Sequence, residues 1–175
     1  MITMKYAQLE HERRFLVAQL PDLSSAVRVL AIDDRYIVGT RMRLRSVTQT
    51  GTPMVHKLGH KVRFDPSSGA EIAHTSLYLD DAERAALAVL PAHPLAKTRH
   101  VLPLDGYLEV AVDVFHGALE GLVLAEVDLG ARHHLPDVLP AWLGREVTDD
   151  DRFTGGALAL LSPDDARAFV ASVLS

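Results

Sequence analysis

Six runs of this sequence alternate between polar and apolar residues with a period of two, and this pattern constrains the fold more than any other feature. Side chains of a β-strand point alternately to its two faces, so each run predicts a strand with one charged and one apolar face. Turn-forming stretches such as TQTGTP and HGALEG separate several runs, which favours antiparallel strands. The runs are Glu10–Val17, Tyr36–Val47, Met54–Phe64, Ala96–Leu102, Tyr107–Phe115 and Leu122–Leu129.

The charges on these faces are sorted by sign from strand to strand. Alternation alone favours an open sheet whose charged face lies in water. A solubilising surface normally mixes the two signs, whereas here three runs contribute only cations and the last two mainly carboxylates. The sorting therefore favours a closed barrel with a polar lumen and an apolar outer face that helices cover. The cations are Arg41, Arg43, Arg45, Lys57, Lys61, Lys97 and Arg99, and the carboxylates are Glu109, Asp113, Glu126 and Asp128.

Two segments predict helices. LDDAERAALAVL has Asp80 or Asp81 as its N-cap, and SPDDARAFVASVL opens with Ser162 as cap and Pro163 at the first helical position. The stretch LPDVLPAWLG is broken by prolines, which predicts irregular structure. A chain of 175 residues with many strands and few helices predicts a single β-dominated α+β domain over residues 1–175.

The composition excludes several classes of protein. Without cysteine the chain has no disulfide framework, thiolate zinc site or cysteine nucleophile, which fits a cytoplasmic protein. The formal net charge of -5 argues against binding nucleic acid through the overall electrostatic field. We also expect neither a signal peptide nor a membrane partner, because no apolar stretch is long enough to span a membrane.

The stretch LEHERRFLV places two carboxylates and a guanidinium, Glu10, Glu12 and Arg14, on one face of a single strand. A lumen with several Arg and Lys side chains suits a polyanion with many oxygens, such as a triphosphate. Facing carboxylates suit a hard divalent cation, which bridges to phosphate oxygens. The pattern thus predicts a site for a metal ion and a phosphate chain inside the barrel.

Five motifs together resemble the CYTH-domain proteins, also called triphosphate tunnel metalloenzymes. EHERRFLV resembles their ExExK signature, and MRLR, KTR, VDVFHGALEGLVLAEVDL and WLGREVTDDDRF follow in the family's order. The resemblance runs from Glu10 to about Leu161. It implies an eight-stranded antiparallel tunnel with helices packed outside, a bound triphosphate, Mg²⁺ or Mn²⁺, and cleavage of a phosphoanhydride bond.

The resemblance also implies roles for individual residues. Glu10, Glu12 and Arg14 form the catalytic signature, with Arg14 standing where the signature has lysine. The middle hairpin supplies one lysine, which the pattern leaves open between Lys57 and Lys61 because both share one strand face. The implied phosphate ligands are Arg14, Arg43, Arg45, Lys57 or Lys61, Lys97, Arg99 and Arg152. The implied metal ligands are Glu10, Glu12, Asp113, Glu126 and Asp128.

Two other functions fit the same motifs. A class IV adenylyl cyclase would share the fold and the metal, although the sequence offers no clear adenine pocket. A triphosphate- or polyphosphate-binding module without turnover would need only the cations. The expected partner in every case is a small molecule that carries a triphosphate, and the oligomeric state is left open, with a homodimer among the alternatives.

Overall fold

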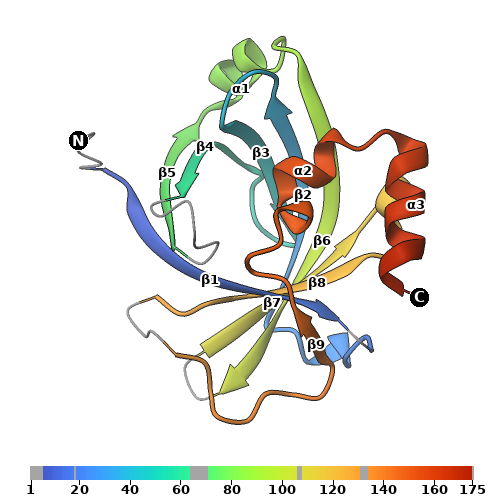
Figure 1. The fold of residues 1–175 in the computed structure, drawn as a ribbon. Helices are drawn as coiled ribbons and strands as arrows, with labels where there is room; N and C mark the ends of the chain where they lie inside the picture. Colours follow the sequence, from blue (N-terminus) through green and yellow to red (C-terminus); the bar gives the residue numbers. More distant parts are fainter. Residues whose placement is uncertain (1–5, 18, 64–70, 106–107, 131–133, 175) are drawn as a thin grey trace.

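The computed structural model describes residues 6–17, 19–63, 71–105, 108–130 and 134–174, and a closed antiparallel barrel dominates it (Figure 1). Eight strands follow one another around the barrel in the order β5-β4-β3-β2-β6-β7-β8-β1, and β1 closes the ring by pairing with β5. The predicted fold class is therefore confirmed. The strands are β1 (Gln8–Val17), β2 (Arg28–Ile37), β3 (Met42–Gln49), β4 (Val55–Arg63), β5 (Glu71–Leu79), β6 (Ala92–Asp105), β7 (Leu108–Phe115), β8 (Val123–Asp128) and β9 (Leu143–Glu146).

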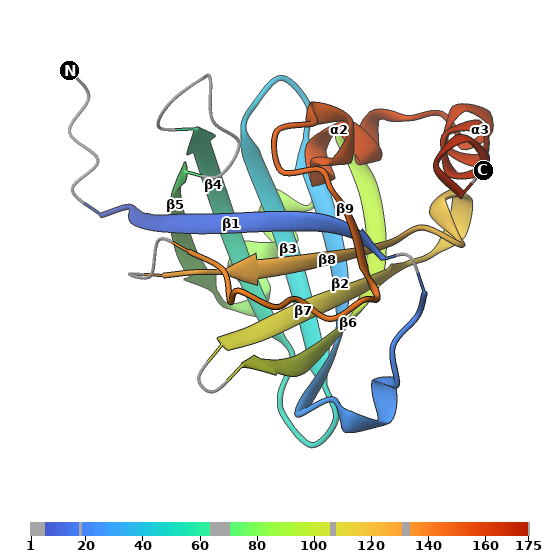
Figure 2. The same cartoon turned by 60° about the horizontal axis from the view of Figure 1, so that its bottom comes forward.

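Strand β1 closes the barrel because it has three partners. One edge pairs with β8, and the register places Arg14 opposite Glu126. The other edge pairs first with β5, where Glu10 lies opposite Ile72, and then with β9 beyond Phe15. Figure 2 shows β9 beside the end of β1. This shared strand carries the signature residues, so barrel closure and the position of the signature are fixed together.

The predicted run Tyr36–Val47 is wrong as a single strand. The structure divides it into the end of β2 and the start of β3, with Gly39 between them at a φ of 75°. Glycine adopts this left-handed conformation without steric cost, so the chain can reverse there. Most of β2 escaped prediction because Asp33 and Asp34 adjoin, which hides the alternation. Phe64 and Tyr107, the ends of two other predicted runs, lie outside the described residues.

The helices pack on the outside of the barrel, as Figure 1 shows for α2 and α3. Of the two predicted caps, Asp80 is the one that caps α1, and it forms a capping box with Glu83. Ser162 Oγ accepts the backbone N–H of Asp165 at 3.2 Å, which confirms the predicted start of α3. The helices are α1 (Asp81–Leu87), α2 (Gly155–Leu160) and α3 (Pro163–Leu174), and the short 3₁₀ turns are η1 (Leu23–Ser25), η2 (Gly117–Leu119) and η3 (Asp151–Phe153).

Two apolar clusters cover different parts of the barrel wall. The first includes Phe153 and Leu158 from the C-terminal segment. The second lies on the outer faces of β1, β7 and β8, where Trp142 and Leu139 from the irregular segment before β9 pack against it. The C-terminal helices pack on the first cluster, whose Leu95, Phe115 and Leu124 continue the inward faces of β6, β7 and β8 beyond the charged residues. Irregular chain covers much of the second cluster, on the outer face. Burial of these apolar side chains stabilises the wall that encloses the lumen.

No helix within the described ranges combines the length and the apolar character needed to cross a membrane.

Tyr36 holds the first turn of α2 against the barrel. A Cβ atom placed on Gly155 would come within 2.0 Å of the Tyr36 hydroxyl oxygen and 3.1 Å of the ring carbon that bears it. Only glycine fits at this position without movement of the tyrosine. The contact joins the end of β2 to the C-terminal segment that borders the lumen.

We predict that Gly155→Ala destabilises the fold by about 1–3 kcal/mol, the usual cost of overpacking. Tyr36→Phe removes the clashing oxygen, so the double variant should recover part of that loss. Urea unfolding of the wild type, both single variants and the double variant measures the coupling. Strictly additive effects of the two substitutions would contradict the contact.

Candidate active site

The charged faces of the strands meet inside the barrel and line two connected cavities. We call the first the cationic chamber; its volume is about 440 Å³, and Tyr36, His74 and the Thr154–Gly156 segment also line it. Eight cationic side chains face three carboxylates there, so an anion entering it meets a net positive field. The charged lining comprises Arg14, Arg41, Arg43, Arg45, Lys61, Arg63, Lys97 and Arg99 with Glu10, Glu12 and Glu126.

The second cavity, which we call the mixed chamber, has a volume of about 670 Å³. Charged and apolar side chains share its walls, and its own two cations already have partners. Arg28 pairs with Glu109, and Lys57 lies 4.9 Å from the centre of the Tyr78 ring. The two chambers share four lining residues, so they meet at one cluster of charges. The shared residues are Glu10, Glu12, Arg99 and Glu126.

Lys61 lies between the two carboxylates of the signature. Its Nζ is 2.8 Å from Glu10 Oε2 and 2.6 Å from Glu12 Oε1. Lys57 lies two pleat repeats earlier on the same strand and lines the mixed chamber, not the cationic chamber. The structure therefore places Lys61, and not Lys57, beside the signature.

Glu126 joins the two sides of the lumen. Arg14 donates to Glu126 Oε1 through Nε and a terminal nitrogen, each at 3.0 Å, and Arg99 donates to Oε2 at 2.5 Å. Burial raises the pKa of Glu126, but the charges of Arg14 and Arg99 outweigh it and hold that pKa well below its ordinary value. Glu126 is thus ionised and held from both sides.

The pKa of Glu12 is shifted in the opposite direction. Burial raises its pKa, and repulsion from Glu126 and Glu10 adds to that rise against the opposing charge of Lys61. Glu10 is the reverse case, because His74 and Lys61 overcome the effect of burial and lower its pKa to about 2. Two neighbouring carboxylates on one strand therefore differ in basicity, a pattern that suits separate roles in proton transfer and ligand binding.

A buried aspartate supports the cations of β3, and another supports those of β6. Asp34 accepts both hydrogen bonds of Arg45, each at 2.7 Å, and also lies 3.5 Å from Arg43. Asp113 accepts two hydrogen bonds from Arg99, each at 2.7 Å, and another from Lys97. These pairs hold the cationic side chains in fixed orientations on the chamber wall.

No family model matches the chain. Over 164 residues the chain is 31% identical to the inorganic triphosphatase of Nitrosomonas europaea, and the match covers 88% of this chain and 99% of that protein. The chain belongs to the family of this inorganic triphosphatase.

Solved structures give the same result. The crystal structure of the inorganic triphosphatase NE1496 matches with a TM-score of 0.57 at 27% identity, over 93% of this chain and 98% of that one. PH1819 from Pyrococcus horikoshii matches with a TM-score of 0.53 at 14% identity, over 71% of this chain and 80% of that one, which shows a shared fold alone. The barrel is thus the architecture of the inorganic triphosphatase family.

Most of the site residues that the sequence predicted line the two chambers, but two do not. Asp113 was expected to hold metal, yet its side chain is 1% exposed, lies behind Lys97 and Arg99, and is not among the described residues lining either chamber. Arg152 was expected to bind phosphate, yet its side chain is 64% exposed and is held by Asp150 in η3. The residues that face the chambers as expected are Glu10, Glu12, Arg14, Arg43, Arg45, Lys57, Lys61, Lys97, Arg99, Glu126 and Asp128.

The sequence analysis did not identify three residues of this site. Asp34 sits in the strand that was not recognised, and Tyr36 was assigned to a different strand. His74 lies on β5, which is not among the alternating runs of the sequence; only the strand register shows that it faces inward, opposite Lys61. Once β5 is recognised as a strand, the alternation of side chains places His74 on the same face as Ile72 and Ser76, and this was the signal that could have identified it.

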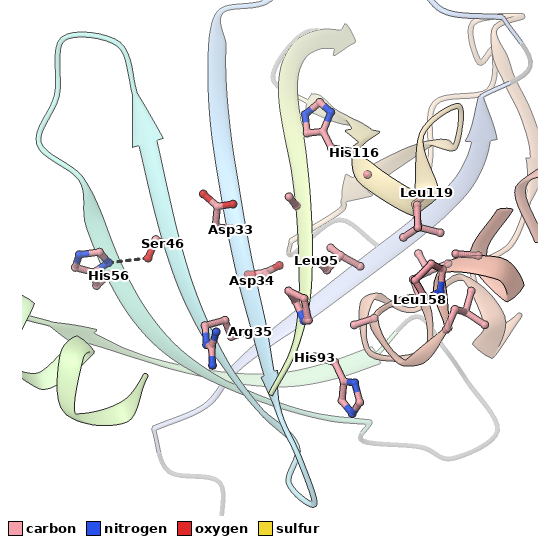
Figure 3. A pocket seen from close by; sticks show the side chains of 18 of the residues that line it. Asp33, Asp34, Arg35, Ser46, His56, His93, Leu95, His116, Leu119 and Leu158 are labelled. Carbon is pink, nitrogen blue, oxygen red and sulfur yellow. Dashed lines mark hydrogen bonds between the residues drawn. The ribbon is translucent and has the colours of Figure 1, made fainter. Parts of the chain in front are cut away.

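A third hollow, the outer groove, lies outside the barrel between β2–β4, β6 and the helices, with a volume of about 1010 Å³ (Figure 3). Ser46 Oγ and His56 Nδ1 are 2.9 Å apart there, and His56 Nε2 lies 3.3 Å from Asp81. The sequence of contacts from Ser46 through His56 to Asp81 resembles a serine–histidine–aspartate triad, but Ser46 is buried within the sheet opposite His56. These contacts instead attach α1 to the barrel wall, and the concentration of cations lies in the lumen.

We predict that Glu10 contributes to acid stability. Because its pKa is lower in the folded chain than the ordinary 4.5, its contribution is present above that value and is lost as the pH falls toward about 2. Across this window the wild type should lose up to roughly 3 kcal/mol more unfolding free energy than Glu10→Gln. Urea unfolding at a series of pH values gives both curves. Glu71→Gln, on the outward face of β5, should run parallel to the wild type, and a Glu10→Gln curve parallel to both would contradict the assignment.

Proposed function

We propose that this chain is a tunnel metalloenzyme of the CYTH type that hydrolyses a triphosphate inside its barrel with the help of a divalent cation. The observation that carries the proposal is the cationic chamber, which ends at the carboxylate cluster of Glu10, Glu12 and Glu126. A chamber with this charge binds a short polyanion, and the cluster lies where a phosphate chain would reach it. Family membership supports the same reaction, because the relative in Nitrosomonas europaea is an inorganic triphosphatase.

The cations would bind the phosphate oxygens. Arg14, Arg43 and Arg99 present planar guanidinium groups, each of which can hold two oxygens at once. Lys61 supplies a compact charge at the centre of the carboxylate cluster. Because each of these side chains now pairs with a carboxylate, a phosphate must take the place of that carboxylate as the partner. Arg45 and Lys97 would complete the chamber wall.

The carboxylates suit Mg²⁺ or Mn²⁺ by their chemistry, since hard cations prefer oxygen ligands. Within the described ranges, no group of three His, Asp or Glu side chains comes together closely enough to hold a metal ion, because cations occupy the spaces between them. Glu10, Glu12 and Glu126, with Asp128 beside them, would hold the cation after phosphate has drawn Lys61, Arg14 and Arg99 away. A bound divalent cation would supply neutralisation of the phosphate charge.

Hydrolysis needs a water molecule positioned opposite the leaving group. The water oxygen forms a bond to the terminal phosphorus, the bond from that phosphorus to the bridging oxygen breaks, and the remaining pyrophosphate leaves with the bonding electrons. Glu12 is the carboxylate we assign to orient this water and accept its proton through an oxygen that the cation leaves free, because its pKa is raised whereas that of Glu10 is lowered. The arginines would stabilise the charge on the transferred phosphoryl group.

We predict that phosphate release from tripolyphosphate stops in excess chelator and returns with Mg²⁺ or Mn²⁺. Glu126→Gln keeps the shape of the side chain and removes its charge, so it should lose most of the activity. Glu71→Gln is the matched control on the outer face. Parallel assays with ATP and thiamine triphosphate compare substrates, and cyclic AMP from ATP would instead show the cyclase. Tight binding of tripolyphosphate by all proteins without any release would show a binding module.

We predict that Arg14 binds phosphate and does not transfer protons. Its side chain is 11% exposed and borders the cationic chamber. Arg14→Ala should weaken tripolyphosphate binding by roughly 1.5–3 kcal/mol, the range for a hydrogen bond to a charged group, whereas Arg14→Lys should keep binding and retain or raise turnover. Calorimetric titration measures both. Arg13→Ala is the matched control, because Arg13 pairs with Glu146 on the outer face; equal affinity of Arg14→Ala and the wild type would contradict the assignment.

A further inference from the structure

His74 lies on the inward face of β5, between the two strands that carry the signature and its lysine. The register places it opposite Lys61 on β4 and opposite Gln8 on β1. Its side chain is 16% exposed and borders the cationic chamber. Gly59 leaves room for it, since a Cβ atom there would lie only 3.3 Å from His74 Nε2. The strand arrangement therefore delivers an imidazole to the carboxylate cluster.

Both ring nitrogens of His74 have partners. Nδ1 is 2.6 Å from Glu10 Oε1, and Nε2 is 3.1 Å from the hydroxyl of Ser76. An ionised carboxylate can only accept, so Nδ1 donates to Glu10. A rotation of the ring would break both interactions, and neither nitrogen offers a free lone pair to a metal ion. The histidine is therefore fixed in orientation and acts on its surroundings through Glu10.

We propose that His74 is a positioning residue that fixes the orientation of the Glu10 carboxylate toward the divalent cation, an inference that rests on the proposed function. Glu10 is held at two points, by His74 through Oε1 and by Lys61 through Oε2. When phosphate takes Lys61, Oε2 becomes available to the cation while Oε1 stays bound to the imidazole. Glu10 then meets the cation with one oxygen in a preset direction.

This arrangement follows the general design of metal sites. Carboxylates that bind metal are themselves hydrogen-bonded, and loss of such a partner typically reduces metal affinity or activity 10–100-fold. Without His74, Glu10 could turn about its own side chain once Lys61 leaves. Ser76 extends the support by fixing the imidazole ring. The row from Ser76 through His74 to Glu10 therefore orders a ligand without touching the substrate.

Direct measurement of Mn²⁺ binding tests the proposal. Electron paramagnetic resonance of free Mn²⁺ gives its dissociation constant, with and without an imido analogue of tripolyphosphate. His74→Phe keeps a ring but loses the donor, and His74→Asn places an amide N–H near the position of Nδ1. Controls are His60→Phe and His60→Asn, which alter an outward-facing histidine on β4. Thermal unfolding of each variant confirms that it is folded.

The expected result is a dissociation constant for Mn²⁺ raised roughly 10- to 100-fold in His74→Phe and restored in large part by His74→Asn. Turnover number should follow the same order, while the KM for tripolyphosphate at saturating Mn²⁺ stays close to that of the wild type. Wild-type Mn²⁺ affinity in His74→Phe would overturn the proposal. Equal losses in both variants would also overturn it, since the imidazole itself would then be required.

The same measurement separates this inference from the proposed function. If the wild type binds Mn²⁺ with the expected dependence on His74 but releases no phosphate from any triphosphate, the proposed hydrolysis fails and the positioning role stands. If the wild type hydrolyses tripolyphosphate with Mn²⁺ and His74→Phe binds Mn²⁺ normally, the positioning role fails and the hydrolysis stands.

Discussion

Charges enclosed in a narrow barrel must be neutralised, and this requirement governs the rest of the structure. An unpaired buried charge costs several kcal/mol, so a lumen lined with guanidinium and ammonium groups needs carboxylates at matching heights. Strand register provides the match: Arg14 lies opposite Glu126, Arg45 opposite Asp34, and Arg99 opposite Asp113. Sorting of charge by strand is the sequence counterpart of this arrangement, because the cations of β3 and β6 lie opposite carboxylates of β2 and β7, while Lys61 of β4 reaches the carboxylates of β1.

Ion pairing within the lumen also couples the binding of the phosphate chain to the binding of the divalent cation in the proposed reaction. Lys61 bridges Glu10 and Glu12, so a phosphate that binds Lys61 releases two carboxylates at once. A cation that binds those carboxylates would in turn release Lys61 for phosphate. Each ligand therefore raises the affinity for the other by the same factor, as linkage requires. On the proposed function, the lumen would therefore bind the pair of ligands more strongly than either ligand alone.

Alternation in the sequence predicted which side chains face inward, but it could not predict how far along the lumen each one lies. Parity correctly placed Arg43, Lys97 and Glu126 inside. It also placed Asp113 inside, yet the register buries that carboxylate behind two cations. The position of a side chain along the barrel axis depends on strand register and barrel stagger. Both are set by pairing between strands that are distant in the sequence, so the sequence of one strand does not reveal them. Arg152 shows the same limit outside the strands, where a local turn with Asp150 decides its direction.

His74 illustrates how one residue type changes the balance of such a lumen. A carboxylate at that position would add an anion beside Glu10 and would need another cation nearby. An imidazole can instead donate to Glu10 without adding negative charge, and its second nitrogen is satisfied by Ser76 on the same strand. The pKa of Glu10 therefore stays low, and among the described Lys and Arg side chains Lys61 pairs with Glu10 and is shared with Glu12. The central cluster thereby holds Lys61 between two carboxylates, which is the arrangement that an incoming phosphate can open.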